Sequence, residues 1–299
     1  MVSSSSASTP SRSPILTAVL WMVGTLISFT LMAISVRQLA GEIHAFEIQF
    51  FRSVGALIIL VPIALAKGRT SLKTEQPQLQ VYRNLVHFAA QLGWIIGIIL
   101  LPLSEVFAIE FTTPIWAAII AALFLGERLN RGRIAAVALG FIGILVILRP
   151  GMVTISPGTF AVLGASVGFA ITLAATKALT KTDAPLTILL YMSLIQLPIG
   201  AVMAAFVWTT PDLLQLFWLL AVGVFGMSAH YCVARALALA DATIVVPMDF
   251  MRLPLIVLVA FVLYGESAQL LVLLGAVIIF AGNYYSIRHE HRLRADAIR

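Results

Sequence analysis

The sequence predicts an all-α membrane protein of ten transmembrane helices, arranged as two inverted repeats of five helices each. Of its 299 residues, 61% are hydrophobic and only 11% are charged, whereas soluble domains carry about 25% charged residues. Apolar runs fill most of the chain, each near the ~20 residues that a helix needs to cross a bilayer. These continuous runs exclude a transmembrane barrel, which would need short alternating strands.

The predicted helices are joined by short connections, so neighbouring helices run antiparallel. The first apolar run begins at Ile15 and is longer than a signal-peptide core, so we expect it to remain as a helix. The repeats should occupy residues 14–150 and 151–287, between a disordered Ser-rich tail at 1–13 and a cytoplasmic tail at 288–299. The predicted spans are 14–36, 44–66, 80–101, 105–125, 131–149, 157–177, 185–208, 212–233, 241–263 and 267–287.

The lysines and arginines predict the orientation of these spans. With the N-terminus in the cytoplasm, the outer segments hold only Arg37 and Arg149, while Arg52 and Arg252 lie within spans. Cytoplasmic loops are enriched in Lys and Arg, so both termini are expected inside and the number of spans should be even. The net charge of +6 therefore indicates orientation, and we expect no nucleic-acid partner. The inner segments hold Arg12, Lys67, Arg69, Lys73, Arg83, Arg128, Arg131, Arg133, Lys177, Lys181, Arg235, Arg288, Arg292, Arg294 and Arg299.

The second half of the chain repeats the landmarks of the first. A unit of five spans is odd in number, so its second copy must enter the membrane the other way up, as in many secondary transporters. The first copy has Leu103-Ser104-Glu105, a helix with Pro114, Leu125-Gly126-Glu127, and a span with Gly140 and Gly143. The second copy has Leu239-Ala240-Asp241, a helix with Pro254, Tyr264-Gly265-Glu266, and a span with Gly275 and Gly282.

The stretch from Leu101 to Pro150 carries a family resemblance. Its run from Glu105 to Trp116, its Leu125-Gly-Glu-Arg-Leu129 segment and its Gly-rich run from Gly140 resemble the EamA family of the drug/metabolite transporter superfamily. The resemblance covers essentially the whole chain and implies a multi-pass carrier of small metabolites in the bacterial inner membrane. Within the family, the chain is most similar to bacterial exporters of amino acids, particularly aromatic ones. One departure is that span seven has no arginine matching Arg52.

The third span has the clearest polar face inside the membrane. Asn84, His87, Gln91 and Trp94 are spaced by three, four and three residues, so they share one side of a helix. Polar groups in lipid cost free energy and usually face the protein interior. The face fits the wall of a substrate pathway, and it also fits a buried network that ties helices together.

The fourth and ninth spans pair proline with charge. Glu110 and Trp116 flank Pro114, which predicts a kink because proline removes a helix hydrogen bond. Asp249 and Arg252 are three residues apart, so they can pair within their helix. The pair fits a structural salt bridge. It also fits a site where Arg252 meets a substrate carboxylate and Asp249 takes up a proton.

Several other polar or aromatic residues are candidates for the pathway. His230 in span eight could couple transport to protons or serve a packing role, while Trp21 and Tyr191 could line the path. Arg52 is expected to pair with an acid on another helix. The predicted pathway residues are Trp21, Asn84, His87, Gln91, Trp94, Glu110, Trp116, Tyr191, His230, Asp249 and Arg252.

These features predict a secondary transporter that exports amino acids or related metabolites by alternating access, with lipid and a small-molecule substrate as its partners. A pocket with aromatics and few charges suits a largely apolar substrate with a zwitterionic end. No catalytic residues, metal or cofactor are expected, and no Walker sequence points to ATP. The G-x-S-x-G match at Gly164 to Gly168 lies within a membrane helix, so it indicates close helix contact and not a hydrolase. The first alternative is an exporter of drugs or other metabolites, and a passive channel and an intramembrane enzyme are further alternatives.

Overall fold

The computed structural model describes residues 14–68, 73–124, 131–149, 155–239, 248–267 and 269–297, and its regular elements are helices. The predicted N-terminal tail and the landmarks at Leu125–Glu127 and Asp241 lie outside these ranges. The helices are α1 (Pro14–Gln38), α2 (Ala45–Lys67), α3 (Pro77–Leu100), α4 (Leu103–Glu110), α5 (Thr113–Phe124), α6 (Arg131–Leu148), α7 (Pro157–Leu179), α8 (Pro185–Ala205), α9 (Leu213–Leu239), α11 (Arg252–Tyr264) and α12 (Leu270–Ala297).

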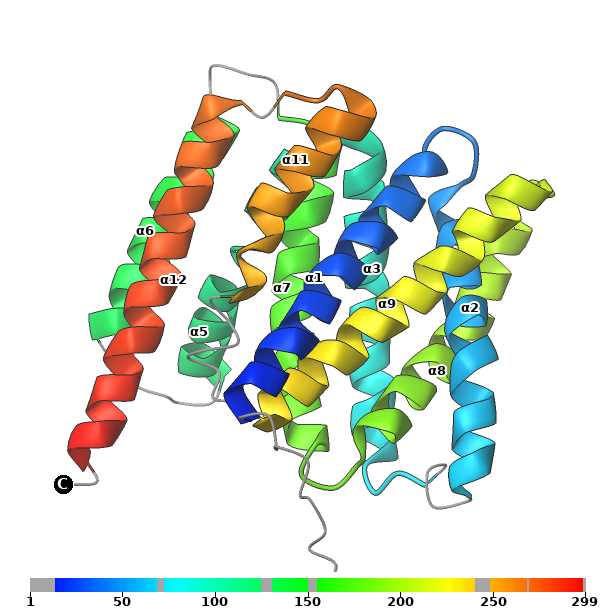
Figure 1. Ribbon diagram of the computed structural model, residues 1–299, viewed down its shortest axis with the longest axis horizontal. Coiled ribbons are helices and arrows are strands. Elements are labelled where there is room, and N and C mark those ends of the chain that lie inside the picture. Colours follow the sequence, from blue (N-terminus) through cyan, green and yellow to red (C-terminus); the bar gives the residue numbers. More distant parts are fainter. Residues whose placement is uncertain are drawn as a thin grey trace, which may run out of the picture.

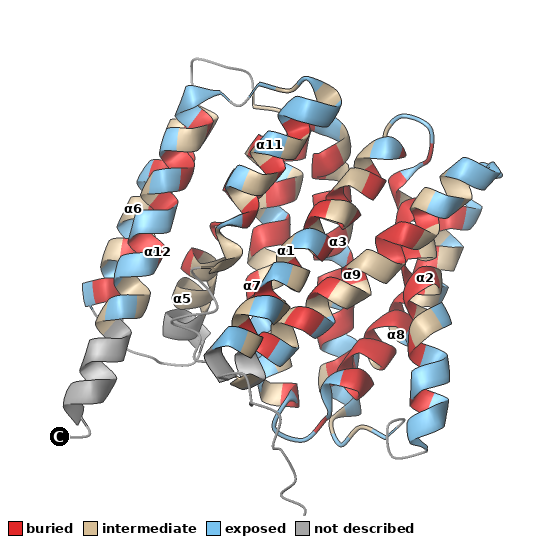
Figure 2. Ribbon diagram, in the orientation of Figure 1, coloured by how far each residue is buried: buried red, intermediate tan, exposed pale blue. Residues whose placement is uncertain are grey.

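The described helices fit the predicted membrane spans. Nine helical segments in these ranges are long and apolar enough to cross a bilayer, and α11 is a shorter apolar helix. Buried residues lie where helices face one another, and the outward faces of α11 and α12 expose apolar side chains such as Leu258, Phe261 and Val277 (Figure 2). Such outward faces are what hydrocarbon requires. The last helix, α12, continues to Ala297 and so extends into the predicted tail.

The helix packing follows a two-fold pattern between the halves. Helix α1 packs on α9 and α3 packs on α7, so the first helix of each repeat contacts the third helix of the other. The second helices, α2 and α8, pack on each other, as do the fifth helices, α6 and α12 (Figure 1). The N-terminus of α1 and the C-terminus of α12 lie at the same end of the bundle (Figure 1). Which side of the membrane that end faces stays a prediction.

The two halves are inverted. Arg37, near the end of α1, donates to the carbonyl oxygen of Leu101 at 3.0 Å, so α1 and α3 end at the same face. A Cβ added to Gly158, near the start of α7, would lie 2.9 Å from Leu100 Cβ. The first helix of the second repeat therefore begins where the first helix of the first repeat ends.

The fourth helix of the first half is broken, and a turn precedes the corresponding helix α11 of the second half. Helix α4 ends at Glu110 and α5 begins at Thr113, directly before Pro114. The proline cannot donate to the Glu110 carbonyl, and the Thr113 hydroxyl donates to it instead at 2.6 Å. In the second half, the chain turns at Phe250 and Met251 before α11 begins, with Pro254 in its first turn. The predicted kink is confirmed as a break.

Small residues allow several helix pairs to approach closely. A Cβ at Gly93 would lie 2.7 Å from the Ala161 carbonyl oxygen, and one at Gly168 would lie 2.7 Å from Ala90 Cβ. The close helix contact predicted at Gly168 is confirmed, and its partner is α3, although Gly164 meets nothing within 4 Å. Helices α2 and α9 are equally close, since a Cβ at Gly55 would lie 2.5 Å from the Leu220 carbonyl oxygen.

A carboxylate ties the repeats together at each end of the bundle. Asp183, before α8, accepts from Gln80 Nε2 at 2.8 Å and from the Glu75 amide at 3.2 Å, as well as from the Thr74 hydroxyl. Glu47, at the start of α2, accepts from the Thr209 amide at 3.1 Å. Each carboxylate thus joins the second helix of one repeat to the segment before the third helix of the other.

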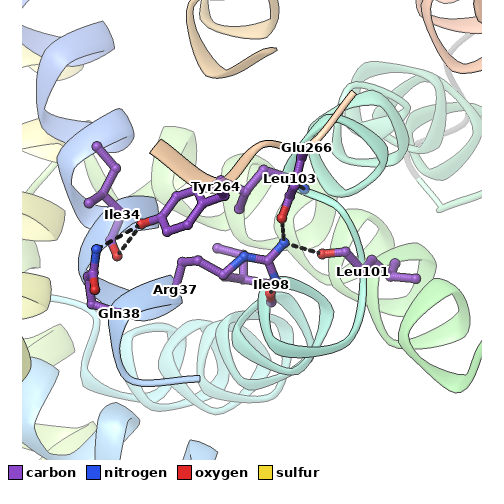
Figure 3. A network of polar contacts seen from close by, with 8 residues as sticks. All are labelled: Ile34, Arg37, Gln38, Ile98, Leu101, Leu103, Tyr264 and Glu266. Atoms are coloured by element: carbon purple, nitrogen blue, oxygen red, sulfur yellow. Dashed lines mark hydrogen bonds and ion pairs between the residues drawn. The ribbon is translucent and has the colours of Figure 1, made fainter. Parts of the chain in front are cut away.

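A larger polar network closes the end of the bundle where α1 finishes (Figure 3). Arg37 donates to the carbonyl oxygens of Ile98 and Leu101 at the end of α3 and pairs with Glu266, which lies between α11 and α12. Glu266 also accepts from the Leu103 amide at 2.9 Å, at the start of α4. The network therefore joins α1, α3 and α4 of the first repeat to the α11–α12 connection of the second.

We expect Gly223→Ala to destabilise the protein. The added Cβ would collide with the backbone carbonyl of Arg52 on α2, and overpacking of this kind costs about 1–3 kcal/mol. The thermal unfolding temperature of the purified protein in detergent measures the effect. Gly164→Ala is the matched control, because its Cβ would meet open space, and an equal loss in both variants would contradict the contact.

We expect Asp183→Ala to lower the unfolding temperature at neutral pH and to have less effect in acid. Burial alone would raise the pKa of Asp183, but hydrogen bonds from Thr74, Gln80 and the Glu75 amide outweigh it and hold the pKa below its ordinary value. The stabilisation is therefore complete above about pH 4 and is lost as the pH falls further. Glu42→Ala, at an exposed carboxylate, is the control, and a pH-independent loss at Asp183 would contradict the assignment.

Candidate functional site

Arg252 lies at the centre of a charged cluster between the break after α4 and the turn before α11. The residue is 4% exposed and is the first residue of α11. Arg252 Nη2 lies 2.8 Å from Asp249 Oδ2 and 3.1 Å from Glu110 Oε1. The predicted pairing of Asp249 with Arg252 is confirmed, and the last residue of α4 supplies a second carboxylate from the other repeat.

Aromatic rings surround this cluster. The Arg252 Cζ atom lies 4.5 Å from the ring centroid of Phe29, 5.2 Å from that of Phe107 and 5.4 Å from that of Phe111. A guanidinium over ring faces at these distances gains cation–π attraction. Trp94 adds a polar contact, because its Nε1 donates to Glu110 Oε2 at 2.7 Å. The rings come from α1, α3 and α4, including the turn after α4, so the cluster draws on several helices of the first repeat.

Two polar atoms of the cluster lack a hydrogen-bond partner. Asp249 Oδ1 and Arg252 Nε are both buried and unpaired. A buried polar atom that goes unsatisfied costs about 1–3 kcal/mol, and more when it belongs to a charged group. The site therefore offers one anionic acceptor and one cationic donor on residues three apart. With two carboxylates and one guanidinium, the cluster would carry one net negative charge when all three groups are ionised.

The predicted polar face of α3 is confirmed as a buried face that serves two places. Asn84, His87, Gln91 and Trp94 are each 3% exposed or less. Trp94 reaches the Arg252 cluster, whereas Asn84 Oδ1 accepts from Arg83 Nη1 at 2.6 Å. His87 Nδ1 lies 3.0 Å from Gln196 Nε2 on α8. The face thus contributes to the charged cluster at one end and to a second polar group at the other.

Arg52 belongs to this second group. The expectation that it pairs with an acid is wrong: the partners that the structure describes for it are amides, with Arg52 Nη2 donating to Gln196 Oε1 and Nε to Gln49 Oε1 at 3.3 Å. Arg83 donates from Nε to the Thr176 hydroxyl at 2.9 Å. The sequence could not reveal this arrangement, because Gln196 is far from both arginines along the chain.

His230 stands between the two groups. Its ring centroid lies 5.5 Å from that of Phe29, which contacts Arg252, and 5.7 Å from that of His87, which contacts Gln196. The histidine therefore packs against rings on both sides. Its predicted role in proton coupling stays a prediction.

The remaining candidates lie outside these two groups. Trp21 packs edge-on against Tyr231 at 5.8 Å and lies under Arg235 near the start of α1. Trp116 donates to the Thr112 hydroxyl at 3.1 Å and packs on Phe141 of α6. Tyr191 is half-buried on α8. Within the described residues, no group of three or more His, Cys, Asp or Glu side chains could hold a metal ion.

Three residues of the charged cluster were not among the predicted site residues. Phe29, Phe107 and Phe111 form its aromatic wall, but a phenylalanine in an apolar span gives no signal that separates it from lipid-facing residues. In the sequence, only Pro114, which predicts a kink, could have pointed to Phe111. Phe29 and Phe107 reach the cluster through packing between helices that are distant in the sequence.

Comparison with known proteins identifies the family. The model of the EamA-like transporter family matches residues 16–149 and again 156–288. The chain is 26% identical to an S-adenosylmethionine uptake transporter of Rickettsia bellii, over 93% of this chain and 96% of that protein. It is 30% identical to a riboflavin transporter of Rhizobium johnstonii, over 95% and 94%.

A solved structure shares the fold. It aligns with a TM-score of 0.66 at 15% identity, covering 93% of this chain and 99% of that one. The duplicated family match agrees with the two helical repeats, and the relatives carry small metabolites across bacterial membranes. The chain therefore belongs to the EamA-like transporter family and is a multi-pass inner-membrane transporter of small metabolites.

Proposed function

We propose that this transporter carries a metabolite with an α-amino-acid head group and a flat aromatic or heteroaromatic body, by alternating access. The observation that carries the proposal is the pair of unsatisfied atoms at the charged cluster, Asp249 Oδ1 and Arg252 Nε. An α-amino-acid head group has a cationic donor, the ammonium, and an anionic acceptor, the carboxylate, on the same carbon atom. It would satisfy both atoms at once.

The surrounding side chains fit the rest of such a substrate. The ammonium group would lie between Asp249 and Glu110. These two carboxylates and Arg252 together carry one net negative charge, which favours a cation. The flat body would pack among Phe29, Phe111 and Trp94, since aromatic rings attract one another in offset-stacked or edge-to-face arrangements. Pockets of this kind are mostly apolar, with a few convergent polar groups that fix orientation.

The relatives support the proposed substrate class. S-adenosylmethionine combines a methionine head group with a flat adenine, and riboflavin contributes a flat ring system without that head group. The aromatic amino acids expected from the sequence belong to the same class. The direction of transport is set by gradients, so the site could serve export, as the sequence resemblance implies, or uptake, as in the S-adenosylmethionine relatives.

Two features support alternating access. Broken helices at corresponding positions of two repeats are typical of carriers whose substrate binds near the middle of the membrane. The network around Arg37 and Glu266 holds together elements of both repeats at one end (Figure 3). Opening that end would require the network to separate. Coupling to protons would involve Glu110 or Asp249, the carboxylates that a cationic substrate would contact.

A competition assay in proteoliposomes tests the head-group requirement. With labelled tryptophan or labelled S-adenosylmethionine as the probe, we expect saturable uptake that unlabelled tryptophan inhibits. Tryptamine lacks the carboxylate and indole-3-propionate lacks the ammonium, so each should inhibit at least about tenfold less well. Equal inhibition by either analogue would contradict the proposed head-group contacts. Non-saturating flux would indicate a channel, and a matched run with a pH gradient measures proton coupling.

Substitutions on α3 test the location of the site. Trp94→Phe keeps an aromatic ring but removes the donor to Glu110, and Gln91→Ala removes a buried amide from the same face. We expect both variants to transport the labelled substrate at least about tenfold more slowly while their membrane abundance stays unchanged. Trp208→Ala, at an exposed tryptophan outside the cluster, is the control. Full transport by both variants would show that α3 does not line the path.

A further inference from the structure

We propose that a second site, between α2, α3 and α8, binds a small anion through Arg52 and Arg83. This site is separate from the charged cluster around Arg252. The proposal does not depend on which substrate the transporter carries. It rests on two buried cations, the nature of their partners, and the unpaired donors beside them.

The first observation is that two buried arginines have no acid partner. Arg52 is 3% exposed and Arg83 is 4% exposed. No carboxylate of the described residues forms an ion pair with either one. Their described hydrogen-bond partners are the amides of Gln49, Gln196 and Asn84 and the hydroxyl of Thr176, all neutral groups.

Buried charges without a counter-charge are costly. Removing an ion from water costs several kcal/mol even after the protein relaxes, and neutral dipoles offset only part of that. Arg252 and Arg37 show the usual solution, since Arg252 pairs with two carboxylates and Arg37 pairs with Glu266. Arg52 and Arg83 belong to one polar group, because Gln196 accepts from Arg52 and donates to the Asn84 carbonyl, and the Asn84 side chain accepts from Arg83. A bound anion would supply the missing negative charge.

The second observation is an excess of hydrogen-bond donors around these arginines. The buried atoms without a partner include Gln49 Nε2 and Asn84 Nδ2. His87 Nε2 is a third. Because Gln196 donates to His87 Nδ1, a neutral His87 carries its proton on Nε2, so this atom is also a donor.

An acceptor-only ligand would satisfy these donors. A water molecule brings two donors of its own, whereas chloride or a carboxylate accepts from several N–H groups and neutralises one arginine. The residues are fully enclosed, so the ligand must be small. Chloride and the carboxylate of a larger molecule share this chemistry, and the experiment below separates them.

The anion site and the Arg252 cluster are complementary in charge. The Arg252 cluster has one more negative than positive group, while the Arg52 group has two positive groups and no negative one. The rings of Phe29, His230 and His87 stand between them. An anion at Arg52 would therefore balance the positive charge of Arg52 and Arg83, which the carboxylates of the Arg252 cluster do not contact.

The test is an anion series on the purified full-length protein in detergent. The unfolding temperature is measured in sodium gluconate, whose anion is too bulky for an enclosed site, and then with chloride or acetate replacing it at constant ionic strength. We expect a saturable rise of about 3 °C or more with at least one small anion. A rise with chloride identifies an inorganic ion, and a rise with acetate alone identifies a carboxylate. No rise with either overturns the proposal.

A matched pair of variants locates the effect. Arg52→Gln should abolish the anion response, and in gluconate it should be at least as stable as the wild type, because an uncompensated charge has been removed. Arg37→Gln loses an arginine that already has a carboxylate partner, so it should keep the full anion response. An unchanged response in Arg52→Gln overturns the assignment to this site. Arg83→Gln replaces Arg52→Gln if the latter does not fold, and the wild-type series is decisive without either.

Discussion

Inside a bilayer, every backbone polar group that enters the hydrocarbon region must find its partner within the protein, and the rest of this structure depends on that constraint. The broken fourth helix shows how it is met. The Thr113 hydroxyl bonds the Glu110 carbonyl at 2.6 Å, and Asn283 Nδ2 of α12 bonds the Phe111 carbonyl at 3.2 Å. With its backbone satisfied in this way, the break can bring the Glu110 carboxylate to Arg252 of the other repeat.

The two repeats share a backbone plan but divide the chemistry between them. Glu47 and Asp183 occupy different positions at the starts of α2 and α8, yet each accepts from the backbone amide before a third helix. The buried cations follow no such symmetry, because Arg52 has no counterpart in α8 and Arg252 has none in α5. A duplicated scaffold therefore holds a single, asymmetric set of charged groups at its centre.

The sequence predicted the fold more fully than the site. Apolar runs mark the spans, the charge bias indicates that both ends lie on one side, and the Pro114 and Pro254 landmarks reveal the repeat. Spacing along one helix also predicted the buried face of α3 and the Asp249–Arg252 pair. Contacts between helices could not be predicted, since the pairing of Glu110 with Arg252, and of Arg52 with Gln196 in place of an acid, depends on how distant helices pack.

The crossing of α1 and α9 has a practical consequence. The chain has one cysteine, Cys232, which is 7% exposed on α9, and a Cβ added to the facing Gly24 of α1 would lie 3.1 Å from its sulfur. Separation of the two helices would expose this sulfur further to a water-soluble thiol reagent. The rate at which Cys232 is alkylated would therefore report how often α1 and α9 separate, and the measurement needs no engineered cysteine.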